Sequence, residues 1–423
     1  MGGETERSRK ACAFHTPFFR NDECYYRQLN HMPSNCPLDR RAFLKFANLL
    51  GLDWLSAPGF TSSAQQERQP THTESSSTKA DASPLTILLK DYRPISLYKI
   101  PATRIEKAKF PVIDIHSHPY AKTPQQIGEW VKNMDETGIE KTTILTMTTG
   151  KEFDEISREY SRHGDRFEMW CGLDFTAYNK AGFPGAAIKE LQRCRDSGAR
   201  GVGEIHDKGK GLRSGKSSAP GMHPDDPRMH EVWEKCGELG LPISLHVADP
   251  IWMYQNMDVH NDGLMNAYYW RLDNQPHIVN LPGMIDILER TVQKHKETTF
   301  IACHFANLDY DLARLGRLLD SNPNLYADIS ARYAETATIP RFTSQFYSHY
   351  ADRLLYGTDM GFDKAMYGIT FRILESLDEH FYEIEQFGYH WSLNGLALPD
   401  TVLQKIYHEN ALKLLAGRGP RAG

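Results

Sequence analysis

The stretch FPVIDIHSHPY, residues 110–120, ends an apolar run with two histidines that are separated by one serine. Its valine and two isoleucines form the short apolar run that is typical of a fully buried strand. Side chains two apart on a strand point the same way, so we expect His116 and His118 to project together from the end of this strand. Two convergent imidazoles indicate a site for a divalent metal, whereas a lone His-x-His pair can also be an incidental surface feature.

The same combination of strand and polar end recurs along the chain. From Lys109 onward, short β-rich runs alternate with longer amphipathic segments, most of which end at Gly or Asn-Pro as helices prefer. The expected strands are residues 112–116, 142–147, 168–174, 199–206, 241–247, 298–304, 325–330 and 353–359. Strict alternation predicts a parallel sheet, and eight such units predict closure into an α/β (β/α)8 TIM barrel. An open doubly wound sheet would instead carry a glycine-rich turn where this chain has its two histidines.

The barrel hypothesis predicts where the chemistry lies, because active-site residues of such barrels come from the C-terminal ends of the strands. Metal-competent side chains stand at five of the eight expected strand ends. They are His116, His118, Glu204, His246, His304 and Asp359. Histidine and carboxylate donors suit Zn²⁺, Mn²⁺ or Fe²⁺, so the sequence predicts a cofactor of this kind.

Six motifs together resemble the amidohydrolase superfamily: VIDIHSHP, GVGEIH, ISLHVADP, FIACHFANL, LLYGTDMGF and KIYHENALKLL. Within it, the chain is similar to the amidohydrolase-related branch that includes aminocarboxymuconate-semialdehyde decarboxylase and related aromatic-acid decarboxylases. The resemblance covers roughly residues 108–417. It implies a catalytic divalent metal, with Zn²⁺ favoured, and a residue that polarises or positions the water bound to that metal. The implied ligands are His116, His118, His246 and Asp359, and the implied water-positioning residue is His304.

The resemblance leaves the role of Glu204 open. In some members of the superfamily, a residue at the end of strand four is a ligand that bridges two metals. In the mononuclear branch, the residue at this position is not a ligand. Glu204 could therefore be a direct ligand, a contact behind the ligands or to substrate, or a structural residue, and the metal count is one or two. His206 is expected on a surface loop.

The ligand set also suggests a mechanism. A metal with an open position lowers the pKa of water towards ~7. Asp359 and His304 are the expected catalytic residues: Asp359 would exchange a proton with water and leaving group, and His304 would stabilise the oxyanion. The leading hypothesis is a hydrolase of a small-molecule amide, ester or lactone. The alternatives are a metal-dependent decarboxylase (carboxy-lyase) of an aromatic or unsaturated acid, and a catalytically silent binding barrel.

Two further stretches are expected to shape the substrate site. The connection after residue 248 is long and rich in Trp, Tyr and Met, and such loops commonly cover substrates. Trp252 and Tyr254 are the expected wall residues, with local packing of the loop on itself as the alternative. Arg332 could clamp a substrate carboxylate or form a salt bridge on the rim.

Composition excludes several other classes of protein. The formal net charge of −5 gives no support for a nucleic-acid partner, and no apolar run reaches the ~18 residues of a membrane span. The seven cysteines form no Cys-x-x-Cys pair, so neither a disulfide framework nor a thiolate zinc site is expected. Cys171 and Cys303 lie in expected strands and are expected to be small buried fillers. The expected partners are a small-molecule substrate and, for the assembly, a second copy in a homodimer.

The chain is expected to have three regions. Residues 1–64 form an N-terminal extension, residues 65–84 a polar linker rich in Ser and Thr, and residues 85–423 the barrel domain.

The N-terminal extension resembles a twin-arginine export signal. Arg40 and Arg41 are followed by Phe-Leu-Lys and a modest apolar segment, although an amphipathic helix with a chance arginine pair is the alternative. Because such signals begin close to their arginines, the expected start is Met32 rather than Met1. The protein is therefore expected to be periplasmic or exported by the twin-arginine machinery, and cytoplasmic if the signal is not functional.

Overall fold

Helix α2 shows how local sequence signals produce an element. The Thr123 hydroxyl accepts a hydrogen bond from the backbone of Gln126, whose side chain accepts one from the backbone of Thr123, both at 3.2 Å. Pro124 occupies the first turn, and Gly138 ends the helix with a φ of 87°. The buried side chains recur every three or four residues, so one face of the helix packs on the barrel: Ile127, Trp130, Asn133, Met134 and Thr137.

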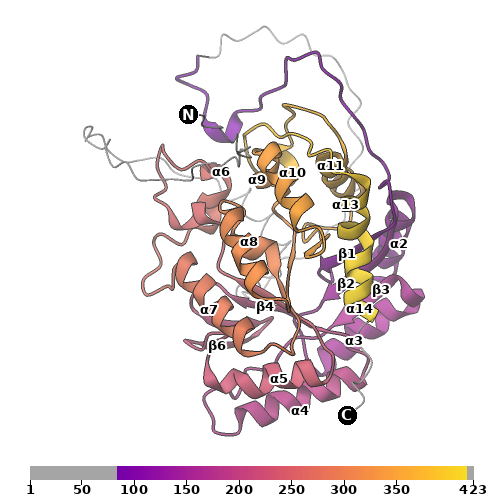
Figure 1. The fold of residues 1–423 in the computed structure, drawn as a ribbon, viewed down its shortest axis with the longest axis vertical. Coiled ribbons are helices and arrows are strands. Elements are labelled where there is room, and N and C mark those ends of the chain that lie inside the picture. The colour runs from indigo at the N-terminus through magenta and orange to yellow at the C-terminus, as the bar shows by residue number, and fades with distance from the viewer. Residues whose placement is uncertain (1–82, 417–423) are drawn as a thin grey trace, which may run out of the picture. The chain divides into compact units, whose positions relative to one another are not determined.

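The computed structural model describes residues 83–416, and in this part of the chain the predicted alternation of strands and helices is present (Figure 1). The barrel strands are β1 (Val112–Ser117), β2 (Ile139–Leu145), β3 (Phe167–Trp170), β4 (Val202–Asp207), β7 (Ile243–Val247), β8 (Phe300–Ala302), β9 (Leu325–Asp328) and β10 (Leu354–Leu355). The main helices between and after them are α2 (Pro124–Thr137), α3 (Gly150–Tyr160), α4 (Phe183–Asp196), α5 (His230–Glu238), α7 (Leu281–Lys294), α8 (Leu312–Ser321), α10 (Pro340–His349), α11 (Lys364–Glu375) and α14 (Asn410–Ala416). Helices α4 and α5, for example, lie side by side against the outside of the strands (Figure 1).

The strands close into a barrel. Parallel pairing runs from β1 through β2 to β3, and from β4 through β7, β8 and β9 to β10. A parallel bridge between Cys171 and Val202 joins β3 to β4, and the Ile115 amide donates to the Tyr356 carbonyl at 2.9 Å, which joins β1 to the residues after β10. These two joins complete the circle of eight parallel strands, so the predicted (β/α)8 fold is confirmed.

One element was not predicted from the sequence. After β4 the chain forms the antiparallel hairpin of β5 (Gly211–Ser214) and β6 (Ser217–Pro220), joined by a two-residue turn at Gly215 and Lys216. Gly215 has a φ of 52°, which is the conformation that the first central residue of such a hairpin turn requires. The hairpin extends the edge of β4, where His206 pairs with Arg213.

The backbone is unusual where the strands end. Several non-glycine residues with positive φ follow the barrel strands: Met147, Ala248, His304, Phe305, Ala306, Asn307, Ala331 and Asp359. Such conformations are costly for residues with a Cβ, and they persist where the surrounding structure fixes them, commonly at functional sites. Strain is thus concentrated at the end of the barrel where the sequence places the site.

Some predictions fall outside the described residues. The twin-arginine segment and nearly all of the polar linker precede residue 83, so the structure does not test them. Among residues 83–416, no helix has the length and apolar character that crossing a bilayer would require. Cys171 and Cys303 are fully buried within this part of the chain, as expected for packing residues.

Candidate metal centre

The two histidines of strand β1 are held in one orientation. His116 Nδ1 lies 2.9 Å from Asp328 Oδ2, and His118 Nδ1 lies 2.9 Å from the carbonyl oxygen of Leu145. A carbonyl or an ionised carboxylate can only accept, so each Nδ1 carries the hydrogen of the neutral ring. The lone pair of each Nε2 therefore faces the interior of the site, which is the orientation that a metal ligand needs.

Two carboxylates complete a four-donor arrangement with these rings. Asp359 Oδ1 lies 3.6 Å from His116 Nε2 and 3.1 Å from His118 Nε2. Glu204 contributes Oε1 at 3.7 Å from His116 Nε2 and Oε2 at 3.5 Å from His118 Nε2. Tetrahedral coordination at the usual Zn–N and Zn–O lengths separates neighbouring donors by about 3.3 Å. The donor atoms of His116, His118 and Asp359 all lie within 4.8 Å of one another, so these three side chains can hold a divalent cation, with Glu204 beside both rings.

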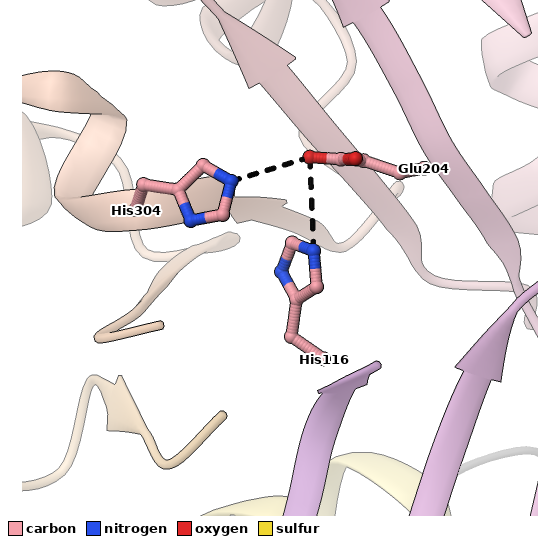
Figure 2. Close-up of side chains that lie close together, drawn as sticks. All are labelled: His116, Glu204 and His304. Atoms are coloured by element: carbon pink, nitrogen blue, oxygen red, sulfur yellow. Dashed lines mark ion pairs between the residues drawn. The ribbon is translucent and has the colours of Figure 1, made fainter. Parts of the chain in front are cut away.

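Glu204 is the centre of the cluster, because its carboxylate contacts histidines from three other strands as well as from its own. Figure 2 shows the carboxylate facing the rings of His116 and His304, with His304 Nε2 at 3.4 Å. His246 Nδ1 lies 2.8 Å from Oε1, and His206 Nε2 lies 2.6 Å from Oε2. Both oxygens face histidine nitrogens, an arrangement that a direct ligand and a contact behind the ligands share, so the role of Glu204 stays a prediction.

His304 faces the same space as Asp359. It follows β8 in a short turn and has a φ of 57°. Its Nδ1 lies 2.9 Å from the Ser330 carbonyl oxygen, so the hydrogen of the neutral ring is on Nδ1. The Nε2 lone pair lies 3.6 Å from Asp359 Oδ2, where it can accept a proton or act as a further ligand.

His246, from strand β7, also contacts Glu204. Its Nδ1 contacts Glu204, and its buried Nε2 lies 3.4 Å from Asp249 Oδ1. It forms a second group of potential ligands with Glu204 and His206, whose donor atoms all lie within 4.8 Å of one another. The expectation that His206 occupies a surface loop was wrong, because alternate residues of β4 share a face and place it beside Glu204.

Burial and charge set the ionisation of these groups. Burial lowers the pKa of His116, but Asp328 and Asp359 outweigh it and raise the pKa to about 9. Burial likewise opposes protonation of His118, yet Asp359 and Glu204 raise its pKa to about 10. Burial prevails at His304 and lowers its pKa. The carboxylates thus favour positive charge at the strand-one pair, carried either by ring protons or by a cation.

The sequence interpretation missed residues behind the ligands. Asp328, the last residue of β9, contacts His116 Nδ1, and Ser330, two residues later, contacts His304 Nδ1. The Tyr120 hydroxyl donates to the Asp359 carbonyl oxygen at 2.8 Å. A sequence signal for Asp328 and Ser330 was present. They form an Asp-x-Ser at the end of the expected strand 325–330, with the same two-residue spacing as His116 and His118.

The expected substrate contacts lie in two settings. Trp252 is half-buried, and its ring packs against those of Tyr389 and Trp391 at centroid distances of 6.4 and 5.7 Å. The Tyr254 hydroxyl is buried with no hydrogen-bond partner among the described residues, and burial raises its pKa. Both belong to the short helical turn Ile251–Tyr254 after β7.

Arg332 is buried rather than on an open rim. Its guanidinium donates to Asn307 Oδ1 and to the Ala331 carbonyl oxygen, and it lies 3.6 Å from Asp309 Oδ1 and 3.9 Å from Glu335 Oε1. These contacts lie within the protein, and the role of Arg332 towards a substrate carboxylate stays a prediction. The guanidinium is thus already satisfied within the protein.

The family model described as amidohydrolase matches residues 113–416, so the chain belongs to the amidohydrolase family. The protein is accordingly an enzyme of the metal-dependent amidohydrolase type, and its His, Glu and Asp cluster can hold a metal ion.

Similar solved structures share little sequence with the chain. A TIM-barrel protein from Bordetella bronchiseptica is 17% identical with a TM-score of 0.44, covering 73% of this chain and 100% of its own. The IDCase from Metarhizium anisopliae, in apo form, is 14% identical with a TM-score of 0.42, covering 72% and 97%. An amidohydrolase from Mycobacterium avium subsp. paratuberculosis is 13% identical with a TM-score of 0.38, covering 68% and 73%. No curated protein matches the chain.

Proposed function

We propose that the protein is a metal-dependent hydrolase that cleaves a small-molecule amide, ester or lactone. The observation that carries the proposal is the set of His116, His118, Glu204 and Asp359, in which each carboxylate has an oxygen 3.1 to 3.7 Å from each imidazole Nε2. These side chains would hold a divalent cation, and a donor set of nitrogen and oxygen favours Zn²⁺, with Mn²⁺ and Fe²⁺ as alternatives.

A bound divalent cation lowers the pKa of water and polarises the bond that is attacked. The chain supplies the proton transfers. Asp359 presents Oδ2 towards His304 Nε2 across 3.6 Å, so these two atoms border the space in which water and substrate would meet. Asp359 would accept a proton from water and return it to the leaving group. Because His304 Nδ1 is committed to Ser330, its Nε2 is the atom that would accept or relay a proton.

One observation favours hydrolysis over decarboxylation. A decarboxylase of an acid must bind the carboxylate that it removes, and Arg332 was the cation expected to do so. In the structure Arg332 donates to Asn307 and lies within 4.0 Å of Asp309 and Glu335, so its guanidinium already has partners within the protein. The preference for a hydrolase rests on these contacts.

The test is a substrate screen of the Zn²⁺-loaded protein with lactones, esters, amides and aromatic or unsaturated acids. A hydrolase would place one oxygen from ¹⁸O-labelled water per turnover in the carboxylic acid product, measured by mass spectrometry. Carbon dioxide release with no labelled oxygen in the organic product would replace the proposal with the carboxy-lyase alternative. Less than about half an equivalent of divalent metal in protein purified without chelator would support a silent binding barrel.

A further inference from the structure

Behind the candidate ligands, the end of strand β9 forms a fully buried clamp made of Asp328 and Ser330. Asp328 Oδ2 accepts from His116 Nδ1 at 2.9 Å. Asp328 Oδ1 accepts from the backbone amides of His304 at 3.0 Å and Ser330 at 3.1 Å, and also from the Ser330 hydroxyl. One carboxylate therefore connects the rear of a candidate ligand with the turn that carries the candidate proton-transfer residue.

We infer that Asp328 is a positioning residue, which fixes the His116 tautomer so that its Nε2 lone pair faces the metal. This inference rests on the proposed function, because it assigns His116 as a ligand. An ionised carboxylate at the rear of a ligating imidazole also makes the ring a stronger donor. The inference concerns the carboxylate only, since the Ser330 hydroxyl has a substitute: the Ser330 carbonyl oxygen already accepts from His304 Nδ1 at 2.9 Å.

Asparagine has the same shape as aspartate, so Asp328→Asn keeps the packing. It reverses the hydrogen bond to His116 Nδ1, as the surrounding donors show. The Oδ1 position receives two backbone N–H groups that cannot turn away, so the amide oxygen of asparagine must occupy it. The amide nitrogen then faces His116 Nδ1 and donates to it. His116 must accept there, which moves its proton to Nε2 and blocks the lone pair that would bind the metal.

A control variant separates this effect from general damage to the fold. Asp378→Asn changes another buried carboxylate, which accepts from Thr103 and Arg372 and is not among the contacts of the cluster. Circular dichroism and thermal unfolding of the metal-free proteins establish that each variant folds.

The experiment measures the dissociation constant for Zn²⁺ alone by competition with a chromophoric chelator at one pH. Asp328→Asn should weaken binding by about 10- to 100-fold, as loss of such partners typically does, while Asp378→Asn stays within about threefold of wild type. The visible absorption of the Co²⁺-loaded protein should change in Asp328→Asn alone. Equal Zn²⁺ affinity in wild type and Asp328→Asn overturns the inference and leaves the proposed function standing. A wild type that binds no divalent cation overturns both.

A second measurement does not depend on the folding of Asp328→Asn. In Zn²⁺-loaded wild type with ¹⁵N-labelled histidine, long-range ¹H–¹⁵N correlations should show the His116 proton on Nδ1, with His116→Asn used for assignment. A His116 proton on Nε2 overturns the inference.

Discussion

Several contacts fix the backbone of Asp359 and thereby place its carboxylate. Its backbone has a φ of 55°, a conformation that few residues with a Cβ adopt. Its amide donates to the His116 carbonyl oxygen at 2.9 Å, and the Tyr120 hydroxyl donates to its carbonyl oxygen at 2.8 Å. Because hydrogen bonds fix both its N–H and its carbonyl group, Asp359 presents its carboxylate to the imidazoles of His116 and His118.

Asparagine tolerates the left-handed conformation at least as well as aspartate, so Asp359→Asn removes the charge without disturbing the backbone. We expect Asp359→Asn and His116→Ala to lower the metal content of the purified protein. Turnover should fall by at least about a hundredfold, because a ligand and a proton-transfer group are lost. Metal content is measured by inductively coupled plasma mass spectrometry, with the exposed His260→Ala as control. Full metal content with near-normal turnover in either variant would refute the ligand assignment.

At the scale of elements, the sequence predicted strand order and strand ends better than the orientation of side chains. Alternation and apolar runs place each barrel strand, but β10 contains only Leu354–Leu355 and Asp359 follows it by four residues. The Nδ1 partners of His116, His118 and His304 come from other strands, so no local pattern could show which ring nitrogen faces the site. Glu204 stayed ambiguous for the same reason, since its five imidazole contacts exist only once the barrel closes.

The join between β3 and β4 yields a prediction about packing. A Cβ added at Gly201 would lie 2.3 Å from the buried ring of Trp170, which has no room to move. We expect Gly201→Ala to lower the free energy of unfolding by about 1–3 kcal/mol through overpacking. Gly128→Ala is the matched control: an added Cβ there meets nothing within 4 Å, and replacing glycine inside helix α2 should stabilise by about 0.5–1 kcal/mol. Denaturant unfolding measures both, and equal effects of the same sign would contradict the packing argument.

For the whole molecule, barrel closure brings together charges that lie far apart in the chain. Histidines of β1, β4, β7 and the turn after β8 meet around one carboxylate, Glu204. The pKa of Glu204 is held well below its usual range: burial opposes ionisation, but His206 and His246 outweigh it. In the closed barrel, protons and a divalent cation therefore compete for the same histidine rings. Protonation of the rings weakens as pH rises, and affinity for the cation increases.

The sign of that dependence follows from the raised pKa values of His116, about 9, and His118, about 10. In the metal-free protein, the stability that these two rings contribute is fully present below the unfolded pKa of ~6.5 and is lost as pH rises through 9 to 10. Cation binding displaces both protons, so affinity for Zn²⁺ should rise with pH, by up to about 100-fold per unit between pH 7 and 9, and level off near pH 10.

Calorimetric titration with Zn²⁺ in buffers of different ionisation enthalpy counts the protons released. About two are expected near pH 8, and His118→Ala should release about one fewer, because one raised group is gone. A dissociation constant that does not change between pH 7 and 9 would show that the strand-one imidazoles are not the groups that the cation displaces.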